Sequence, residues 1–238
     1  MPRVPAMNPK SPEIGLRWRI IRVIVGGPYL LALRVRVSGL DRIPAEGPAI
    51  LAVNHVSVLD PIAVALAAYS RGRAIRFLAA AEFFSHPLTG LVLRGWGQIP
   101  IRRGTRDLAA LEELTGVLRL GGLAGIFPEG RVANGSIRTR GGTGVARVAR
   151  ATGAPVIPVA IWGTQARWPR GRLELSGPIR TPVAIAIGEP IGVDPAASGS
   201  TRPLRTVTDQ IMSSIEELAA TARLATERWL LPRRGADA

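Results

Sequence analysis

Cysteine is absent from the 238-residue chain, and histidine occurs only as His55 and His86. Without cysteine the protein can have no disulfide, no thiolate metal site and no cysteine nucleophile. Two histidines cannot build a typical zinc site without help from carboxylates, and no His-Glu-x-x-His spacing occurs. We therefore expect no metal site in this protein.

Lysine is nearly absent, since Lys10 is the single lysine among 31 basic residues, and acidic residues number only 17. The net charge of +14 attracts phosphate groups on nucleic acid, on anionic lipid or on a small substrate. A biased genome composition would explain arginine in place of lysine, but not the shortage of acids. Charge alone therefore leaves open a non-catalytic module that binds membrane or nucleic acid.

Long apolar runs are also missing. The most apolar early stretch, residues 20–33, is too short to cross a bilayer and contains Arg22 and Pro28. Arginines on both sides favour a helical segment at the membrane surface, with apolar side chains below the head groups and Trp18 and Tyr29 at the interface. A core helix followed by a strand is the alternative. The polar, proline-broken first residues predict no secretory signal.

The rest of the pattern predicts an α/β fold with a single mixed sheet flanked by helices. We expect strands at residues 33–39, 49–54, 74–80, 98–103, 123–127, 155–163, 172–177 and 182–190. We expect helices at residues 61–69, 81–97, 107–120 and 144–152, and from Leu204 onward, where an apolar stripe runs to Trp229. The predicted parts are a membrane-associating segment at 1–37, an α/β catalytic domain at 38–203 that ends in a linker, and a C-terminal amphipathic helix and tail at 204–238.

The run NHVSVLD, residues 54–60, follows a predicted buried strand and precedes Pro61. It indicates either a helix start, with Asp60 capping and Pro61 in the first turn, or half of an active site. Ser57 is a rival cap, which would place Asp60 in a capping box. Residues five apart on a regular helix do not meet. His55 and Asp60 can pair only if His55 lies in the turn before the helix and Asp60 in its first turn.

Three further stretches stand at predicted strand ends: GQIPIRR at 97–103, FPEGR at 127–131 and PVIPVAI at 155–161. With NHVSVLD they resemble, in order and approximate spacing, the four blocks of the glycerolipid acyltransferase family, which includes the 1-acyl-sn-glycerol-3-phosphate acyltransferases. The resemblance spans about residues 40 to 165. It implies a glycerol-3-phosphate acyltransferase-like fold.

The resemblance also implies an activity, which is transfer of a fatty acyl chain from acyl-CoA or acyl carrier protein to lysophosphatidic acid, making phosphatidic acid. The same chemistry on another acceptor, such as a phosphoinositol mannoside or an ornithine lipid, is the alternative. No cofactor is implied beyond the acyl-donor substrate. The implied partners are the lysophospholipid, the acyl thioester and an anionic membrane surface, not nucleic acid. The implied location is the cytoplasmic face of the cell membrane, with peripheral attachment.

Family roles carry over to the matching residues. An alcohol needs a base to become a nucleophile, and His55, oriented by Asp60, is the implied general base. Arg103 is the implied ligand of the acceptor phosphate, with a solvated strand end as the alternative. Glu129 is the implied ligand of a glycerol hydroxyl, with a plain turn as the alternative. The remaining implied substrate-binding residues are Asn54, Gly97, Phe127, Pro128, Gly130, Arg131 and Pro158.

The sequence departs from the family pattern at two places. Arg131 follows Gly130 directly, where relatives continue Thr-Arg-Ser, so the role of Arg131 stays open. Ala80 and Ala81 stand where many relatives carry a lysine. His86 matches no block, and we expect it at a helix end or on the surface.

Overall fold

Seven strands form one mixed sheet in the part of the chain that the computed structural model describes, which is residues 15–102, 107–133, 140–169, 174, 180–193 and 204–230. Their order is β1-β7-β6-β2-β5-β3-β4. The strands are β1 (Leu33–Ser38), β2 (Ala49–Val53), β3 (Ile75–Ala80), β4 (Ile99–Ile101), β5 (Leu123–Ile126), β6 (Val156–Trp162) and β7 (Thr181–Ile187). Neighbours pair in parallel except β6 and β7, which pair antiparallel. The predicted single mixed sheet is confirmed.

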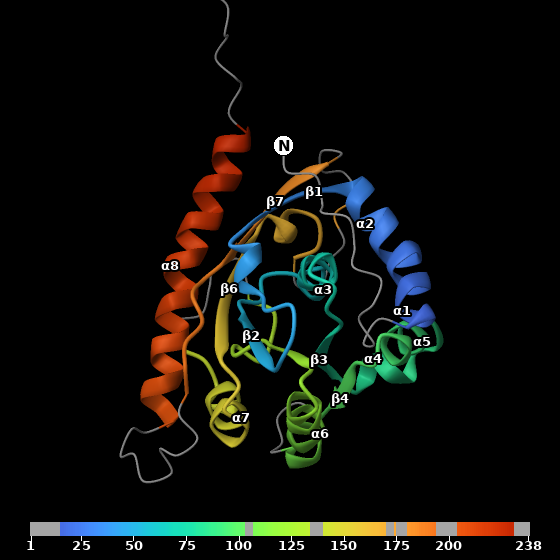
Figure 1. Ribbon diagram of the computed structural model, residues 1–238. Coiled ribbons are helices and arrows are strands. Elements are labelled where there is room, and N and C mark those ends of the chain that lie inside the picture. Colours follow the sequence, from blue (N-terminus) through green and yellow to red (C-terminus); the bar gives the residue numbers. More distant parts are fainter. Residues whose placement is uncertain are drawn as a thin grey trace, which may run out of the picture.

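Helices cover both faces of this sheet, and Figure 1 shows α3 and the N-terminal helices on one side and α8 on the other. The helices are α1 (Leu16–Ile21), α2 (Gly27–Ala32), α3 (Asp60–Ser70), α4 (Glu82–Ser85), α5 (Pro87–Gly95), α6 (Leu108–Arg119), α7 (Gly144–Thr152) and α8 (Leu204–Leu230). A π-helical turn, η1 (Arg22–Gly26), joins α1 to α2, and two 3-10 turns are η2 (Leu40–Arg42) and η3 (Thr164–Ala166).

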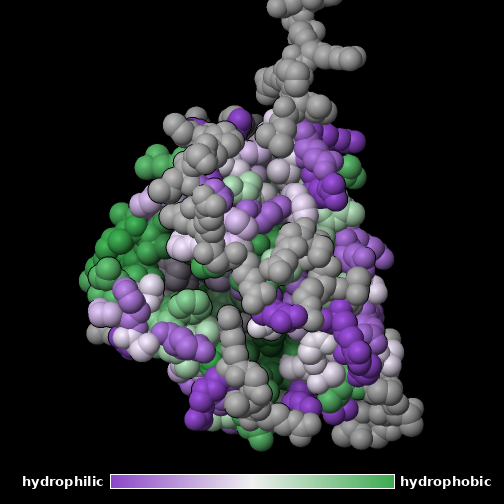
Figure 2. All heavy atoms as spheres, turned by 180° about the vertical axis from the view of Figure 1, so that it is seen from behind, coloured by the Kyte–Doolittle hydropathy of each residue, from purple (hydrophilic) through white to green (hydrophobic). Residues whose placement is uncertain are grey.

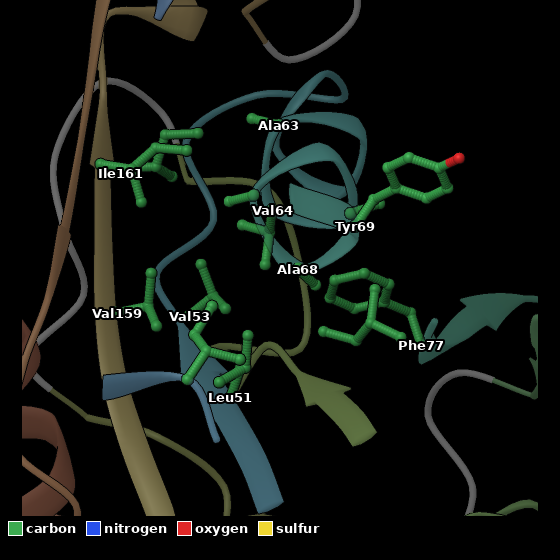
Figure 3. Close-up of a cluster of buried hydrophobic side chains, with 14 of the residues drawn as sticks. Leu51, Val53, Ala63, Val64, Ala68, Tyr69, Phe77, Val159 and Ile161 are labelled. Atoms are coloured by element: carbon green, nitrogen blue, oxygen red, sulfur yellow. The ribbon is translucent and has the colours of Figure 1, made fainter. Parts of the chain in front are cut away.

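Strand β2 lies near the centre of the sheet and is buried on both faces. Leu51 and Val53 pack on the side of α3 (Figure 3), whereas Ile50 and Ala52 pack on the side of α6, α7 and α8. Alternate residues of a strand face opposite ways, so a strand covered twice must be apolar throughout. This explains the unbroken run AILAV and confirms that residues 49–53 form a buried strand.

The long helical stretch predicted at residues 81–97 is wrong in one respect, because it is two helices. Helix α4 ends at Ser85 and α5 begins at Pro87. Proline lacks an N–H and disfavours a helical residue before it, so His86 takes an extended conformation. His86 is exposed at this break, as expected for a helix-end residue. The predicted strand at 172–177, apart from Glu174, and the linker at 194–203 lie outside the described residues.

The inner face of the N-terminal segment is part of the core. Trp18 is only 3% exposed and stacks between Tyr69 of α3 and Trp96, with ring centroids 5.6 and 5.2 Å away. Tyr29 is 5% exposed, and this burial, together with the negative charge of Asp60, raises its pKa well above the ordinary value. The predicted interface position of Trp18 and Tyr29 is therefore wrong, because stacking and burial hold these rings inside the protein.

The outer face of the same segment is apolar and exposed, and it continues onto α4 and α5. The side chain of Ile21 lies against Gly95, which joins α1 to α5. Figure 2 shows hydrophobic side chains gathered on this flank, which we call the apolar patch. Its residues are Leu16, Ile20, Val23, Ile24, Leu30, Leu31, Phe83, Leu88 and Leu91.

Arg34 and Arg36, which follow this segment, contact the C-terminal helix of the protein. The guanidinium groups of Arg34 and Arg36 in β1 lie over the ring of Trp229 in α8, 5.0 and 3.7 Å from its centroid. Cation–π contacts of this kind tie the first strand to the end of the last helix. Within the described ranges, no helix has both the length and the apolar character needed to cross a bilayer.

Candidate active site

Three parallel strands end next to one another at the carboxyl edge of the sheet. Strand β2 lies between β5 and β6 and pairs in parallel with both. Asn54 and His55 follow β2, Phe127 to Glu129 follow β5, and Gly163 and Thr164 follow β6. Open α/β sheets bind their ligands at such an edge. The topology therefore brings the first, third and fourth sequence blocks together.

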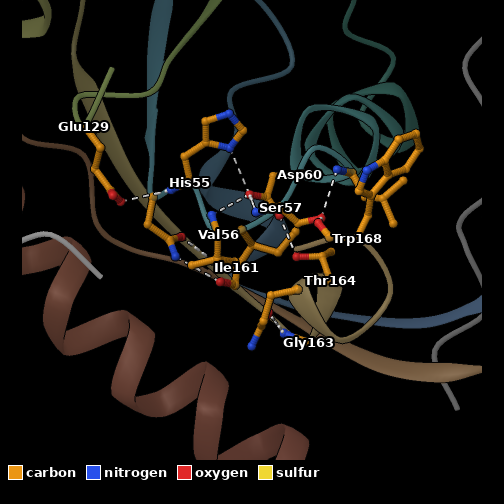
Figure 4. A network of polar contacts seen from close by, with 12 residues as sticks. His55, Val56, Ser57, Asp60, Glu129, Ile161, Gly163, Thr164 and Trp168 are labelled. Atoms are coloured by element: carbon orange, nitrogen blue, oxygen red, sulfur yellow. Dashed lines mark hydrogen bonds and ion pairs between the residues drawn. The ribbon is translucent and has the colours of Figure 1, made fainter. Parts of the chain in front are cut away.

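His55 and Asp60 form a buried pair at this edge (Figure 4). His55 lies in the loop after β2, and Asp60 is the first residue of α3. The Nδ1 atom of His55 is 3.0 Å from Oδ2 of Asp60. An ionised carboxylate only accepts hydrogen bonds, so we assign Nδ1 as the donor, and in a neutral imidazole the lone pair is then on Nε2. His55 thus lies before the helix and Asp60 in its first turn, as the sequence requires for pairing. In this arrangement Nε2 can accept a proton.

The carboxylate of Asp60 points back along the chain instead of capping α3. Its Oδ2 atom accepts from the backbone N–H groups of Val56, at 2.8 Å, and Ser57, at 2.7 Å. The N-cap residue of α3 is Leu59, with no side-chain cap bond. Half of the predicted capping box is present, because Oδ2 of Asp60 accepts from the N–H of Ser57, whereas Oγ of Ser57 accepts from Leu59 N–H and donates to the carbonyl of Trp168. Asp60 therefore orders the loop and holds the imidazole.

Asn54 fixes the base of the loop. Its side-chain nitrogen donates to the carbonyl of Ile161, at 3.0 Å, and its side-chain oxygen accepts from the N–H of Ile161, at 2.7 Å. Asn54 is fully buried, so these bonds fasten the end of β2 to β6. We predicted Asn54 as a substrate ligand, and the contacts observed are those of a residue that positions His55.

The third block packs directly on His55. Oε1 of Glu129 accepts from the backbone N–H of His55 at 3.0 Å, and the ring of Phe127 stacks on the imidazole at 4.1 Å. Gly130 has a φ of +69°, which a side chain disfavours, and its N–H donates to the carbonyl of Phe127. The FPEG run thus forms one wall of the site. Its predicted contacts with substrate, including those of Pro128, stay predictions.

Gly97, Pro158, Arg131 and Arg103 are the remaining predicted site residues. Gly97 has a φ of +64°, and a Cβ there would meet the guanidinium of Arg76, so glycine is favoured before β4. Pro158 is buried inside β6 beside Gly188. Arg131 is exposed. Arg103 lies outside the described residues, so its role rests on the resemblance alone.

Thr164 is a site residue that the sequence analysis missed. Its Oγ1 donates to Oδ1 of Asp60 at 2.6 Å across 104 residues of sequence. The only hint was a glycine and a threonine directly after a buried strand. No group of three or more histidine, aspartate or glutamate residues that could hold a metal ion occurs within the described ranges.

Comparisons with known proteins agree with this geometry. The crystal structure of the LPA acyltransferase PlsC from Thermotoga maritima matches with a TM-score of 0.64 and 28% identity, over 85% of this chain and 79% of that one. A lyso-ornithine lipid O-acyltransferase of Pseudomonas aeruginosa is 37% identical over 61% of this chain and 52% of that protein. A 1-acyl-sn-glycerol-3-phosphate acyltransferase of Borreliella burgdorferi is 31% identical, over 57% and 54%.

This chain spans no more than 64% of the length of the first curated relatives that it matches. The family model described as Acyltransferase matches residues 34–162, which is more than half of the chain and includes all four blocks. Together with the sheet order and the paired His55 and Asp60, this match shows that the chain belongs to the acyltransferase family.

Proposed function

We propose that the protein is an O-acyltransferase that moves a fatty acyl chain from acyl-CoA or acyl carrier protein to the free hydroxyl of lysophosphatidic acid. The observation that carries this proposal is the buried His55–Asp60 pair, in which Nδ1 of His55 lies 3.0 Å from Oδ2 of Asp60 and Nε2 is on the opposite side of the ring. The similarity to acyltransferases named for 1-acyl-sn-glycerol-3-phosphate supports the acceptor. The product would be phosphatidic acid, an intermediate of phospholipid biosynthesis.

The proposed reaction needs no covalent bond to the protein. Nε2 of His55 takes the proton of the acceptor hydroxyl while the hydroxyl oxygen attacks the thioester carbonyl carbon. Asp60 stabilises the imidazolium that forms, as in other histidine–carboxylate pairs. When the tetrahedral intermediate collapses, the carbon–sulfur bond breaks and the imidazolium returns the proton to the departing thiolate. The ester and a free thiol are the products.

A second acceptor has specific support, because the relative from Pseudomonas aeruginosa is named for a lyso-ornithine lipid. The test is release of CoA from long-chain acyl-CoA by the purified protein, measured against lysophosphatidic acid, other lysophospholipids and lyso-ornithine lipid. We expect the highest kcat/KM with lysophosphatidic acid. A preference for lyso-ornithine lipid would change the proposed acceptor. The proposal would be contradicted if no acceptor led to release of a thiol, either from acyl-CoA or from acyl carrier protein.

Arg103 is proposed to bind the acceptor phosphate. Arg103→Ala should raise the KM for lysophosphatidic acid at least tenfold and change the KM for the acyl donor little, because a charge-assisted phosphate contact is lost. Arg102 offers a matched control, since its side chain is 78% exposed and its guanidinium lies near Asp107. Arg102→Ala should change neither KM by more than about twofold. If Arg103→Ala changed the KM values of both substrates equally, Arg103 would not be the residue that binds the acceptor phosphate.

We also propose that the apolar patch docks on the cytoplasmic face of the cell membrane, where the acceptor's tail lies. The patch carries exposed apolar side chains on α1, η1, α2, α4 and α5, and Arg19 of α1 and Arg94 of α5 are exposed on two of these helices. Apolar burial and attraction of arginine to anionic lipid act together at a membrane surface. This refines the prediction made for residues 1–37, since part of the proposed surface belongs to α4 and α5.

Point substitutions test this docking surface better than removal of the N-terminal segment, which would take Trp18 out of the core. The double variants Ile20→Ser/Ile24→Ser and Leu88→Ser/Leu91→Ser should each weaken binding to vesicles containing anionic phospholipid about tenfold or more, since each removes two exposed apolar side chains that would be buried in the membrane on docking. Leu224→Ser is the control, because this exposed leucine lies on α8, on the opposite flank (Figure 1). Unchanged binding by both double variants would place the docking surface elsewhere.

A further inference from the structure

The end of β6 is built to bring one hydroxyl to Asp60. Gly163 has a φ of +106°, and a Cβ there would lie 2.2 Å from the carbonyl oxygen of Pro182, so only glycine allows the chain to turn there. The turn is held locally, because the N–H of Gly163 donates to Oε1 of Gln165. Thr164 follows at once and begins η3. Its side chain is therefore placed by a rigid, sterically closed corner.

The two oxygens of Asp60 have different partners. Oδ2 faces the Nδ1–H of His55 and the N–H groups of Val56 and Ser57. Oδ1 accepts from the hydroxyl of Thr164 at 2.6 Å, and both side chains are fully buried. A buried anionic oxygen without a donor is unfavourable, so this hydroxyl balances the carboxylate on the side away from the imidazole (Figure 4).

Strand β6 and the turn that follows it therefore support the loop of His55 and the start of α3 at two points. Asn54 is fastened to Ile161, and Asp60 is fastened to Thr164 three residues later on the same strand end. The first contact fixes the position of the loop, and the second fixes the rotation of the carboxylate about its own axis. Without the second contact, the plane of the carboxylate would be set from one oxygen only.

We propose that Thr164 is a positioning residue of the site, which holds Asp60 so that Oδ2 faces Nδ1 of His55 and Nε2 stays free to take the acceptor proton. This inference rests on the proposed acyltransferase function. Thr164 acts through Asp60 and does not touch the reacting atoms. It extends the pair of His55 and Asp60 to a chain of three side chains that come from β2, α3 and the end of β6.

The test compares Thr164→Val, which keeps the shape and removes the hydroxyl, with Thr164→Ser, which keeps the hydroxyl. Thr164→Val should lower kcat about tenfold, the effect of one hydrogen bond to a charged group, with both KM values within about twofold of the wild type. Thr164→Ser should restore kcat to within about threefold. Thr208→Val is the matched control, because Thr208 is a buried threonine of α8 whose hydroxyl donates to Leu204 in its own helix.

A second measurement needs no activity. The chain has only two histidines, so ¹⁵N-labelled histidine gives two ring systems, and His86→Gln assigns them. At a pH high enough for both rings to be neutral, His55 should be the Nδ1–H tautomer in the wild type and in Thr164→Ser. In Thr164→Val it should be a mixture of the Nδ1–H and Nε2–H tautomers.

An unchanged kcat and a single Nδ1–H tautomer in Thr164→Val would overturn the role of Thr164 while leaving the proposed function intact. A wild-type protein inactive on every acceptor would overturn the function, and the tautomer measurement alone would then decide whether Thr164 orients the pair.

Discussion

Replacing His55 with alanine should lower the rate of acyl transfer by about 10³–10⁴-fold, towards the upper end of the effect of a general base. The acceptor hydroxyl then has no imidazole to take its proton, because the other histidine of the chain, His86, lies exposed between α4 and α5. The measurement is single-turnover transfer from labelled acyl-CoA to lysophosphatidic acid, which separates the chemical step from product release.

Folding must be followed in the same variant, because His55 also contacts its surroundings. Its ring stacks on Phe127, so His55→Ala should lower the melting temperature by some degrees without loss of the folded state. His86→Ala is the matched control and should be as active as the wild type. A folded His55→Ala protein that keeps a tenth or more of the wild-type rate would eliminate His55 as the base.

Part of the arrangement at the sheet edge could be predicted from local patterns, and the resemblance to the family favoured the pair of His55 and Asp60 over a helix cap. The run AILAV is apolar on both faces of a strand, and Pro61 marks the first turn of a helix, so the loop between them had to place His55 at a strand end. The condition that Asp60 stand in the first turn follows from helix geometry. These features are short-range, and all of them are confirmed.

The contacts that complete the site could not be predicted from the same patterns. Thr164 is 104 residues from Asp60, and only the pairing of β2 with β6 brings them together. The predicted interface position of Trp18 and Tyr29 in the N-terminal segment was wrong for a different reason. Both of its faces are apolar, so periodicity does not tell which one faces the core. The stacking of Trp18 on Tyr69 and Trp96 decides it, and that stack joins three separate segments.

Replacing Asp60 with asparagine should lower the rate about 10²-fold, and the structure gives a particular reason for this size. In a histidine–carboxylate pair, an amide can turn its NH₂ group toward the ring and force the wrong tautomer, with a loss of about 10⁴-fold. Here the N–H groups of Val56 and Ser57 both point at the position of Oδ2. An NH₂ group cannot stand opposite two further donors, so the amide oxygen must occupy that position.

The amide nitrogen of Asp60→Asn would then face Thr164, whose hydroxyl can accept a hydrogen bond as well as donate one. His55 keeps its Nδ1–H donor bond and its free Nε2. What is lost is the negative charge that stabilises the imidazolium, and a charge-assisted bond becomes a neutral one. Asp60→Ala differs, because it leaves the two backbone N–H groups buried without an acceptor and should be markedly less stable.

Rate and tautomer measured together decide between the two outcomes for Asp60→Asn. We expect about a 10²-fold slower single turnover with His55 still in the Nδ1–H form, read from ¹⁵N-labelled histidine. A loss near 10⁴-fold with the ring in the Nε2–H form would mean that the amide has flipped against two backbone donors. In that case the loop 54–59 rearranges in the variant, and the orientation of residue 60 is not set by the amides of Val56 and Ser57.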